Sequence, residues 1–365
     1  MKLYHVISLS TAGLLSLGTL GLLAQTKQVE LNQDFRMETL TGNVAILNGV
    51  SLENIVKVDQ NKYSKVTLNG EHATLEPTVY DAYHGVTSQQ LENRELYRHV
   101  NHPITFENED YLMTIQFDYL FPYSSHIPTA RLAVKNKISN EVVVKNPVLE
   151  QLTSSEWIND EYLSESNGTY YYVLTTSGRN NDNSRILVYT INPDTLDFTF
   201  KFEKKLINSG ISTCVDNLLY TIEYDSVSTY SNPQLMIINL ETEETSIQSL
   251  GKDLYLESII KTDSNLYFIA DSTLYRYTPE EPNIMTEIPS PSFLNTLNDS
   301  NYYWISQKMV NDQYLYLLFD VYNEGMSQQF LAVLDTDKQK FVYEGKINIR
   351  QDQGLQDSYQ LKLNK

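Results

Sequence analysis

One pattern recurs along the chain and limits the folds that it can adopt. It consists of a turn, a hydrophobic strand closed by Asp, a loop and a second hydrophobic strand. The clearest copy runs from Asp312 to Asp335, with apolar strands at 314–319 and 330–334. Further copies begin near Leu218 and Leu266. Such repeats are typical of a β-propeller or a related array, in which each repeat folds as one small unit against its neighbours.

The spacing of the repeat is that of a propeller blade. The closing Asp recurs at Asp118, Asp225, Asp271 and Asp320, and the last two intervals are 46 and 49 residues. The first interval spans two units, because the second unit has Thr175, Thr176 and Ser177 at this place. Propeller blades of about four strands repeat every ~40 to 50 residues. The inner strands of five blades are therefore expected to begin near the following residues: Asp110, Thr169, Leu218, Leu266 and Tyr314.

The two ends of the chain supply the strands of one more blade. Strands are predicted at 50–58, 63–68 and 72–75, and Asn69-Gly70 is a strong hairpin signal between the last two. The alternating tail 358–363 predicts a fourth strand. We therefore expect an all-β propeller over residues 41–365 with six blades, one shared between the chain ends, and an irregular insertion near 82–101. Five or seven blades are also possible. A closed ring is expected because closure hides the sheet edges that a linear array would expose.

The N-terminal segment, residues 1–25, contains a long uncharged run. Val6 to Ala24 is 19 residues of mainly Leu, Gly, Ser, Thr and Ala, which as a helix can just cross a bilayer core. It is longer than the usual apolar region of a signal peptide. An uncleaved signal anchor and a cleaved signal peptide both remain open. The expected location is the cell membrane, with a single transmembrane helix and the bulk of the chain extracytoplasmic, or secreted in the alternative. Residues 26–40 are expected to form a polar spacer.

Charge and cysteine content exclude several classes of function. The formal net charge is −19, which repels phosphate backbones, so a nucleic-acid partner is not expected. Cys214 is the sole cysteine, so the chain can form no internal disulfide and no Cys-type metal site. Because it lies in a strand-like run, Cys214 is interpreted as a small buried hydrophobe.

The repeat resembles the family of extracytoplasmic β-propellers of the YVTN or quinoprotein-like kind. The resemblance rests on strand–Asp–loop–strand units such as Gln329 to Asp337 and covers about residues 108–350. The segment Thr41 to Val50 looks like part of uncharacterised membrane-anchored proteins of Gram-positive bacteria. The chain has no Trp-Asp dipeptide and has 2 Trp residues, too few for the docking motifs of quinoprotein dehydrogenases. The resemblance implies the fold and little about function, since propellers host many activities.

The loops between the first two strands of each unit carry the candidate binding residues. Mixed aromatic and polar loops on a rigid scaffold are common binding sites, although such loops can also be tolerated surface insertions. The candidates for ligand or partner binding are Tyr119, Tyr123, His126, Arg179, Asp182, Tyr230, Tyr322 and Glu324.

The closing aspartates have two interpretations. Asp begins turns by bonding to its own backbone, and a ring of carboxylates could instead hold calcium, which takes six or more oxygen ligands. No other cofactor is expected, and no hydrolase, phosphate-loop or zinc-protease motif is present. The leading hypothesis is a membrane-anchored, extracytoplasmic propeller that binds a protein or a small ligand. The alternative is an exported hydrolase or lyase with carboxylates at the channel mouth.

Overall fold

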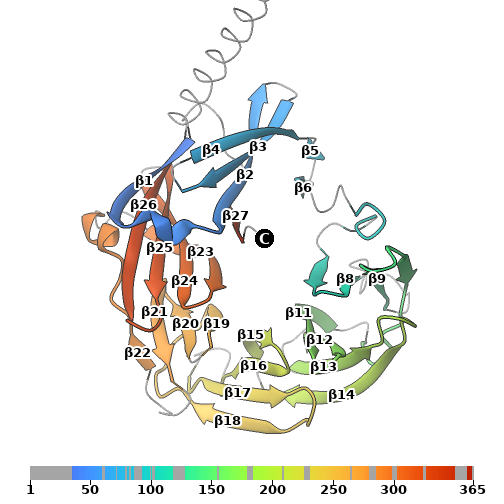
Figure 1. Cartoon of the computed structure of the whole chain (residues 1–365). Coiled ribbons are helices and arrows are strands. Elements are labelled where there is room, and N and C mark those ends of the chain that lie inside the picture. Colours follow the sequence, from blue (N-terminus) through green and yellow to red (C-terminus); the bar gives the residue numbers. More distant parts are fainter. Residues whose placement is uncertain are drawn as a thin grey trace, which may run out of the picture. The chain divides into compact units, whose positions relative to one another are not determined.

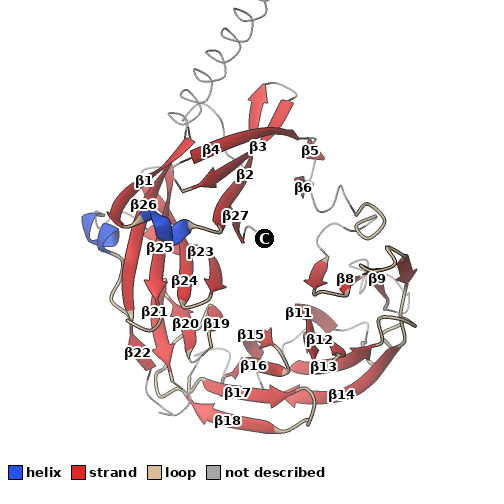
Figure 2. Cartoon of the chain, viewed as in Figure 1, coloured by secondary structure: helices blue, strands red, loops and turns tan. Residues whose placement is uncertain are grey.

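The computed structural model shows an all-β chain with the fold of a six-bladed β-propeller (Figures 1 and 2). It describes residues 35–59, 62–70, 72–78, 80–81, 84–85, 93–98, 100, 103–117, 128–153, 156–178, 184–207, 209–225, 231–263, 265–278, 285–297, 302–323, 326–349 and 360–363. Within these ranges the blades are six antiparallel sheets, five of four strands and one of five. The helices of the described chain are two short 3-10 helices, η1 (Val44–Leu47) and η2 (Ser292–Thr296).

Four blades belong to one compact unit, residues 87–288, which we call the four-blade unit. Within each blade the strands follow one another as an antiparallel meander. The first strands of successive blades, β7, β11, β15 and β19, lie next to one another. The blades are β7–β10 (Ile104–Glu107, Tyr111–Phe117, Ala130–Asn136, Val142–Lys145), β11–β14 (Glu156–Ser166, Thr169–Gly178, Ser184–Ile191, Phe198–Leu206), β15–β18 (Ser209–Val215, Leu218–Glu223, Gln234–Asn239, Thr245–Ser249) and β19–β22 (Ser258–Lys261, Leu266–Ala270, Thr273–Tyr277, Met285–Glu287).

The other two blades form the two-blade unit, residues 1–86 and 289–365. Their strands are β23–β26 (Tyr302–Asn311, Tyr314–Asn323, Met326–Asp335, Lys340–Ile349) with β1 (Phe35–Gly42), and β2–β4 (Val50–Asp59, Lys62–Asn69, His72–Thr78) with β27 (Gln360–Leu363). β27 pairs with β2, so one blade combines an N-terminal and a C-terminal part of the chain, as predicted. β1 pairs with β26 and adds a fifth strand to the other blade.

Two details of the sequence prediction were wrong. The spacer predicted to reach residue 40 instead contains β1, which begins at Phe35, because Phe35 and Met37 are buried against the two-blade core. All five strands predicted to be innermost are the second strands of their blades; they were expected to begin near Asp110, Thr169, Leu218, Leu266 and Tyr314. The true first strands are mostly half-exposed and polar, as in β11, so they lack the hydrophobic pattern that marks the second strands.

The predicted insertion near 82–101 is described in parts. β5 (Tyr80–Asp81) pairs with β6 (His84–Gly85). Residues 93–98 form a turn that docks on β8 and β9: Leu96 is fully buried against Leu112 and Ala133. The Arg131 guanidinium donates to the carbonyl oxygens of Leu96 at 2.7 Å and Glu95 at 2.9 Å. This part of the insertion is thus fixed to its blade.

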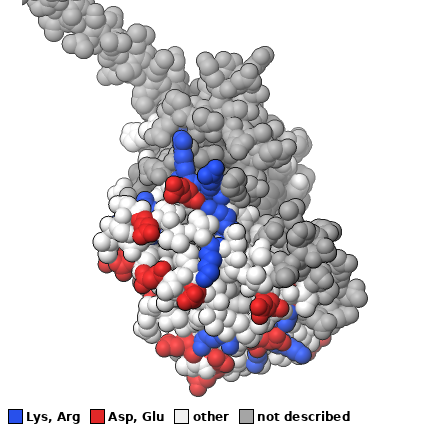
Figure 3. Space-filling view, turned by 90° about the vertical axis from the view of Figure 1, so that its right-hand side faces the viewer, with Lys and Arg blue, Asp and Glu red and all other residues white. Residues whose placement is uncertain are grey.

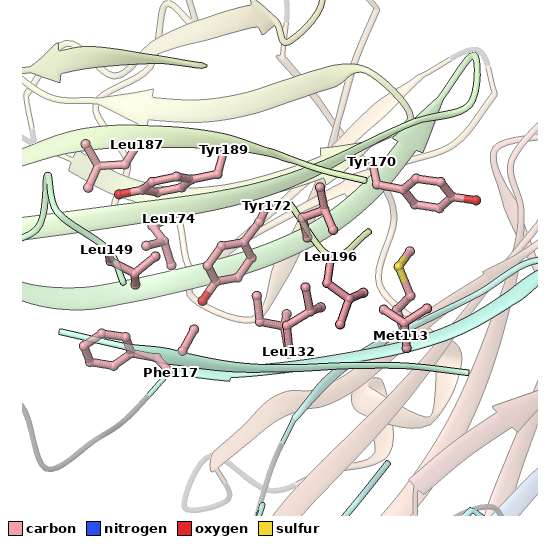
Figure 4. Close-up of a cluster of buried hydrophobic side chains, with 14 of the residues drawn as sticks. Met113, Phe117, Leu132, Leu149, Tyr170, Tyr172, Leu174, Leu187, Tyr189 and Leu196 are labelled. Atoms are coloured by element: carbon pink, nitrogen blue, oxygen red, sulfur yellow. The ribbon is translucent and has the colours of Figure 1, made fainter. Parts of the chain in front are cut away.

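The cores between blades explain why the chain uses so much tyrosine. Figure 4 shows the cluster between β7–β10 and β11–β14, in which Tyr170, Tyr172 and Tyr189 lie among leucines. Their rings are buried, and the hydroxyl of Tyr172 donates to Glu161 Oε2 at 2.5 Å. The hydroxyl of Tyr170 accepts a hydrogen bond from Asn108 Nδ2 at 2.8 Å. Tyr170 and Tyr172 thus fill the apolar interior and place their polar tips at partners.

The predicted transmembrane or signal helix, residues 1–25, lies outside the described residues. In the portion of the chain that the structure describes, no helix has the length and apolar character needed to cross a bilayer.

Candidate binding surface

Three aromatic side chains gather on one face at the edge of the β23–β26 sheet. They are Tyr302 and Trp304 on β23 and Tyr322 on β24, which we call the aromatic surface. Tyr302 lies directly opposite Tyr322, and Trp304 is two residues further along the same strand, so all three project from one face. Tyr302 is 61% exposed and Trp304 is 36% exposed, whereas Tyr316, Phe319 and Tyr343 of the same blade are buried. The aromatic surface therefore lies open to solvent.

The three rings are stacked on one another. The centroid of Tyr322 is 5.3 Å from that of Tyr302 and 5.5 Å from that of Trp304, and Tyr302 and Trp304 are 5.9 Å apart. All three ring planes lie within 23° of one another. If the three rings were stacked in a single column, the distance between the first and third centroids would be about twice the distance between adjacent ones. The near-equal distances instead describe a triangle of overlapping, almost parallel rings.

The opposite face of the same strands explains why these rings point outward. Tyr303 lies between Tyr302 and Trp304 and packs toward Phe319, with 6.4 Å between their ring centroids. Phe319 in turn packs edge-on to Phe293 of η2, and Phe293 stacks on Phe330 at 4.4 Å. Because η2 covers this face with aromatic rings, the strand alternation leaves Tyr302 and Trp304 on the other one.

A carboxylate holds η2 in that position. Glu344 on β26 is 4% exposed and accepts hydrogen bonds from the backbone N–H of Ser292 at 2.8 Å, from the Ser292 hydroxyl at 2.7 Å and from the backbone N–H of Phe293 at 3.0 Å. It thereby satisfies two backbone donors at the start of η2, which otherwise lack partners. The aromatic surface is thus supported from behind by a fixed aromatic layer.

A buried polar pair lies beside the aromatic surface. Asp320 pairs in register with Trp304 on one side and Gln329 on the other, so its side chain lies on the same face as the aromatic surface. Asp320 is 7% exposed and Gln329 is 5% exposed, and the amide of Gln329 donates to Asp320 Oδ1 at 2.5 Å. The Gln329 amide therefore holds one oxygen of this carboxylate.

Of the residues predicted to bind a ligand or partner, the structure describes Tyr322 alone. Tyr322 is part of the aromatic surface. Asp118 lies outside the described residues. So do the other loop candidates, which are Tyr119, Tyr123, His126, Arg179, Asp182, Tyr230 and Glu324. Binding by these residues stays a prediction.

Three of the four closing aspartates are described, and each has a local environment of its own. Asp225 accepts a hydrogen bond from Asn232 Nδ2 at 2.8 Å across its loop. Asp271 and Ser272 form a two-residue turn with positive φ angles of 46° and 61°, as expected of a type I′ hairpin. Asp320 is paired with Gln329. Among the residues that the structure describes, no three His, Cys, Asp or Glu gather at a distance suited to a metal ion. The calcium ring stays a prediction.

Sequence reasoning missed Tyr302 and Trp304. They belong to an inner strand that precedes the recognisable hydrophobic repeat, and that strand has no hydrophobic alternation. A usable signal was present in the run Tyr302-Tyr303-Trp304, which has three aromatics in succession and one of the 2 Trp residues of the chain.

Other polar clusters of the described chain are structural. In the four-blade unit, Asp160 Oδ2 accepts from the Ser212 hydroxyl at 2.8 Å, and Ser212 Oγ lies 3.0 Å from the Tyr162 hydroxyl. Burial, reinforced by the charge of Asp160, raises the pKa of Tyr162 far above its usual range, so this phenol cannot act as a base near neutral pH. Burial likewise raises the pKa of the Cys214 thiol to about 12, which keeps it a thiol rather than a nucleophilic thiolate.

One charged face and one hollow of the described chain were other surface features that could have held reactive groups. On the face drawn in Figure 3, Lys and Arg form a narrow line with Asp and Glu close by, rather than a broad basic area. A hollow of about 360 Å³ lies beside η1 and the β3–β4 hairpin, and His72 is the only titratable residue in its lining. Neither feature brings together groups that could perform a reaction.

The comparisons with known proteins identify a fold and no family. No family model matches the sequence, and neither does any curated protein. Among solved structures, the chain is similar to an ACO/RPE65 chimera in its trigonal crystal form, at 9% identity and a TM-score of 0.51, covering 87% of this chain and 93% of that one. It is also similar to cobalt-substituted Synechocystis apocarotenoid oxygenase, at 9% identity and a TM-score of 0.47, covering 84% and 74% of the two chains. At such identity the likeness concerns the propeller fold alone.

Proposed function

We propose that this propeller is a binding module that receives its ligand or partner on the aromatic surface of β23 and β24. The observation that carries the proposal is the exposure of Tyr302 and Trp304 within a triangle of stacked, nearly parallel rings. Tyr and Trp are enriched where proteins bind, because each ring offers a large contact area and a polar tip. The rings are already stacked on one another, so little conformational entropy is lost when a ligand covers them.

The cellular location belongs to the same proposal. The uncharged run Val6 to Ala24 supports an exported chain held at the membrane by residues 1–25, or a secreted one if that segment is cleaved. The acidic charge supports a partner other than nucleic acid. The full chain expressed in a bacterial host is expected to resist alkaline extraction from membranes and to be degraded by protease added to intact cells. Full protection from that protease would contradict export.

A panel of chemically different ligands tests the proposed function. The full chain is immobilised and exposed to neutral polysaccharides, charged polysaccharides, basic peptides and membrane vesicles. At least one class is expected to be retained by the unaltered chain and released by Tyr302→Ala and Trp304→Ala. Tyr255→Ala and Trp157→Ala serve as matched controls, because these rings are 49% and 40% exposed but belong to the four-blade unit.

Thermal unfolding verifies that each variant is folded before its binding is compared. Retention that survives both Tyr302→Ala and Trp304→Ala would show that the aromatic surface is not the site. Absence of retention for every class would contradict a binding module of this kind.

A further inference from the structure

We infer that the ligand of the aromatic surface is a neutral glycan, a chain of uncharged sugar rings. This inference rests on the proposed binding function and specifies the chemistry of what is bound. Shape, hydrogen-bonding capacity and charge each bear on it.

The shape of the aromatic surface selects a flat ligand. Proteins that bind quaternary ammonium groups surround the cation with rings, as walls of a cage. Here the three ring planes lie within 23° of one another, so none of the rings stands upright as the wall of a cage. A sugar ring presents a flat face of C–H groups about as wide as one aromatic ring, and C–H groups are attracted to the negative face of an aromatic ring.

The polar groups of the aromatic surface suit the rim of a sugar. Tyr302 and Tyr322 each carry a hydroxyl that can donate and accept, and Trp304 carries an indole N–H donor. Among the described residues, none forms a hydrogen bond with these three groups. A sugar bound face-on places its hydroxyl groups outward around the ring, where such donors and acceptors can reach them. A purely apolar ligand would leave these polar groups without partners, which is unfavourable on burial.

Charge separates a neutral glycan from other flat ligands. The net charge of −19 disfavours nucleobases joined by phosphates and acidic polysaccharides. A planar guanidinium also stacks on aromatic rings, but its tight binding needs a free carboxylate beside it. The carboxylate described on this face is Asp320, which is 7% exposed and bonded to Gln329. Among the residues that the structure describes, this face therefore offers stacking and hydroxyl recognition without a free charge.

Affinity electrophoresis of the full chain tests the inference. The probes are neutral polysaccharides (xylan, glucomannan, hydroxyethyl cellulose, amylopectin and mixed-linkage glucan), the acidic polygalacturonate, and an arginine-rich peptide in a separate titration. We expect at least one neutral polysaccharide to retard the chain. Trp304→Ala and Tyr302→Ala are expected to weaken this binding by about tenfold or more, and Trp304→Phe to restore part of it, since each lost ring contact removes stacking. Tyr255→Ala and Trp157→Ala are expected to bind as the unaltered chain does.

A spectroscopic readout locates the ligand independently. In a Trp157→Phe background Trp304 is the only tryptophan, and covering its half-exposed ring should shift its emission to shorter wavelength. Should Trp304→Ala fail to fold, Tyr302→Ala carries the test, since Tyr302 is 61% exposed.

The outcomes separate the inference from the proposed function. The chain could bind only the arginine-rich peptide or polygalacturonate and lose that binding in Tyr302→Ala. This result would overturn the assignment to a neutral glycan and leave the proposed binding function standing. Neutral polysaccharides that bind the chain without shifting Trp304 emission would overturn the assignment to this surface. No binding to any neutral polysaccharide would overturn the inference itself.

Discussion

Tyr302 and Tyr322 lie opposite each other on β23 and β24, with ring centroids 5.3 Å apart and planes 15° apart. Tyr322 touches both other members of the aromatic surface, whereas its own exposure is lower than that of Tyr302. The cross-strand pair therefore helps to keep the exposed rings nearly parallel. Aromatic pairs on neighbouring strands are recognised units of sheet stability.

A double-mutant cycle measures this pairing. Tyr302→Ala and Tyr322→Ala together are expected to destabilise the fold by less than the sum of the single effects, with a coupling free energy of about 0.5 to 1.5 kcal/mol. Urea unfolding of the four proteins gives this value. The combination of Tyr302→Ala with Ile247→Ala, on a strand of another blade, should be additive. A coupling of zero between the two tyrosines would mean that their stacking does not order the surface.

Glu156 and Arg185 form the most buried ion pair of the described chain. Arg185 donates to both carboxylate oxygens, at 2.6 and 2.7 Å, and the side chain of Glu156 is 5% exposed. Burial alone would raise the pKa of Glu156, but the hydrogen bonds from Arg185 and Thr153 outweigh it and hold the pKa below its usual value. The Thr176 hydroxyl also donates to this carboxylate, so the lone pairs of the Glu156 oxygens are well satisfied.

Glu156→Gln should therefore make the protein less stable and less sensitive to acid. Removal of one partner of a buried pair costs about 3 to 5 kcal/mol, because the other charge stays buried. A carboxyl whose folded pKa is depressed stabilises the fold above its unfolded pKa of about 4.3, and this contribution is lost as the pH falls through the folded value. Unfolding free energies measured between pH 7 and pH 3 should fall less steeply in Glu156→Gln than in the unaltered chain.

Glu243→Gln is the matched control for this comparison. Its carboxylate lies 3.4 Å from Lys201 Nζ and is 50% exposed, so its loss should change stability by less than about 1 kcal/mol. If both variants gave equal losses, the Glu156–Arg185 pair would not be the buried determinant that its geometry indicates.

Much of the fold could be predicted from the sequence because the second and third strands of each blade are buried on both faces. Strands such as β20, with every residue buried, are continuous apolar runs and repeat at a recognisable interval. The inner strands were missed since they are flanked by another strand on one side only. β23 alternates between exposed and half-buried positions and contains a bulge near Ser306, so its pattern is not that of a buried strand.

The candidate site could be predicted only in part, for the same physical reason. Tyr322 was identified because it follows the closing Asp320 of a recognisable repeat. Tyr302 and Trp304 become its neighbours only through the register of β23 with β24, and that register depends on the bulge. The hydrogen bonds of Asp320 and Asp225 depend on Gln329 and Asn232, and nothing in the period of the repeat specifies these partners.

Glu344→Ala tests whether η2 is held by its carboxylate. The variant leaves the part-buried backbone N–H of Ser292 and the buried backbone N–H of Phe293 without their acceptor. The expected loss is about 1 to 3 kcal/mol, with faster amide hydrogen exchange confined first to these two residues. Glu344→Gln keeps one acceptor oxygen, so its stability should lie between those of Glu344→Ala and the unaltered chain. Unchanged exchange at Ser292 in Glu344→Ala would show that the Phe293 stack alone fixes the segment.

β27 joins the last described residues to a blade begun near the N-terminus, and Leu361 is its anchor. Leu361 lies opposite Leu52, packs against the two-blade core, and its N–H donates to Gln307 Oε1 at 2.8 Å. Leu361→Asp places a charge against this core and should destabilise the fold by about 2 to 4 kcal/mol. Leu363→Asp is the control in the same strand, because Leu363 is 42% exposed and its change should stay within about 1 kcal/mol.

Urea unfolding with hydrogen exchange at β2 distinguishes the possible results. If β27 closes its blade, Leu361→Asp removes the strand that covers one edge of β2, so exchange should accelerate at Val50 to Glu53, the residues paired with β27. β3 covers the other edge of β2 and should retain more of its protection, since its pairing with β4 is untouched. Equal losses in Leu361→Asp and Leu363→Asp, with no change in exchange at β2, would mean that the blade is stable without its C-terminal strand.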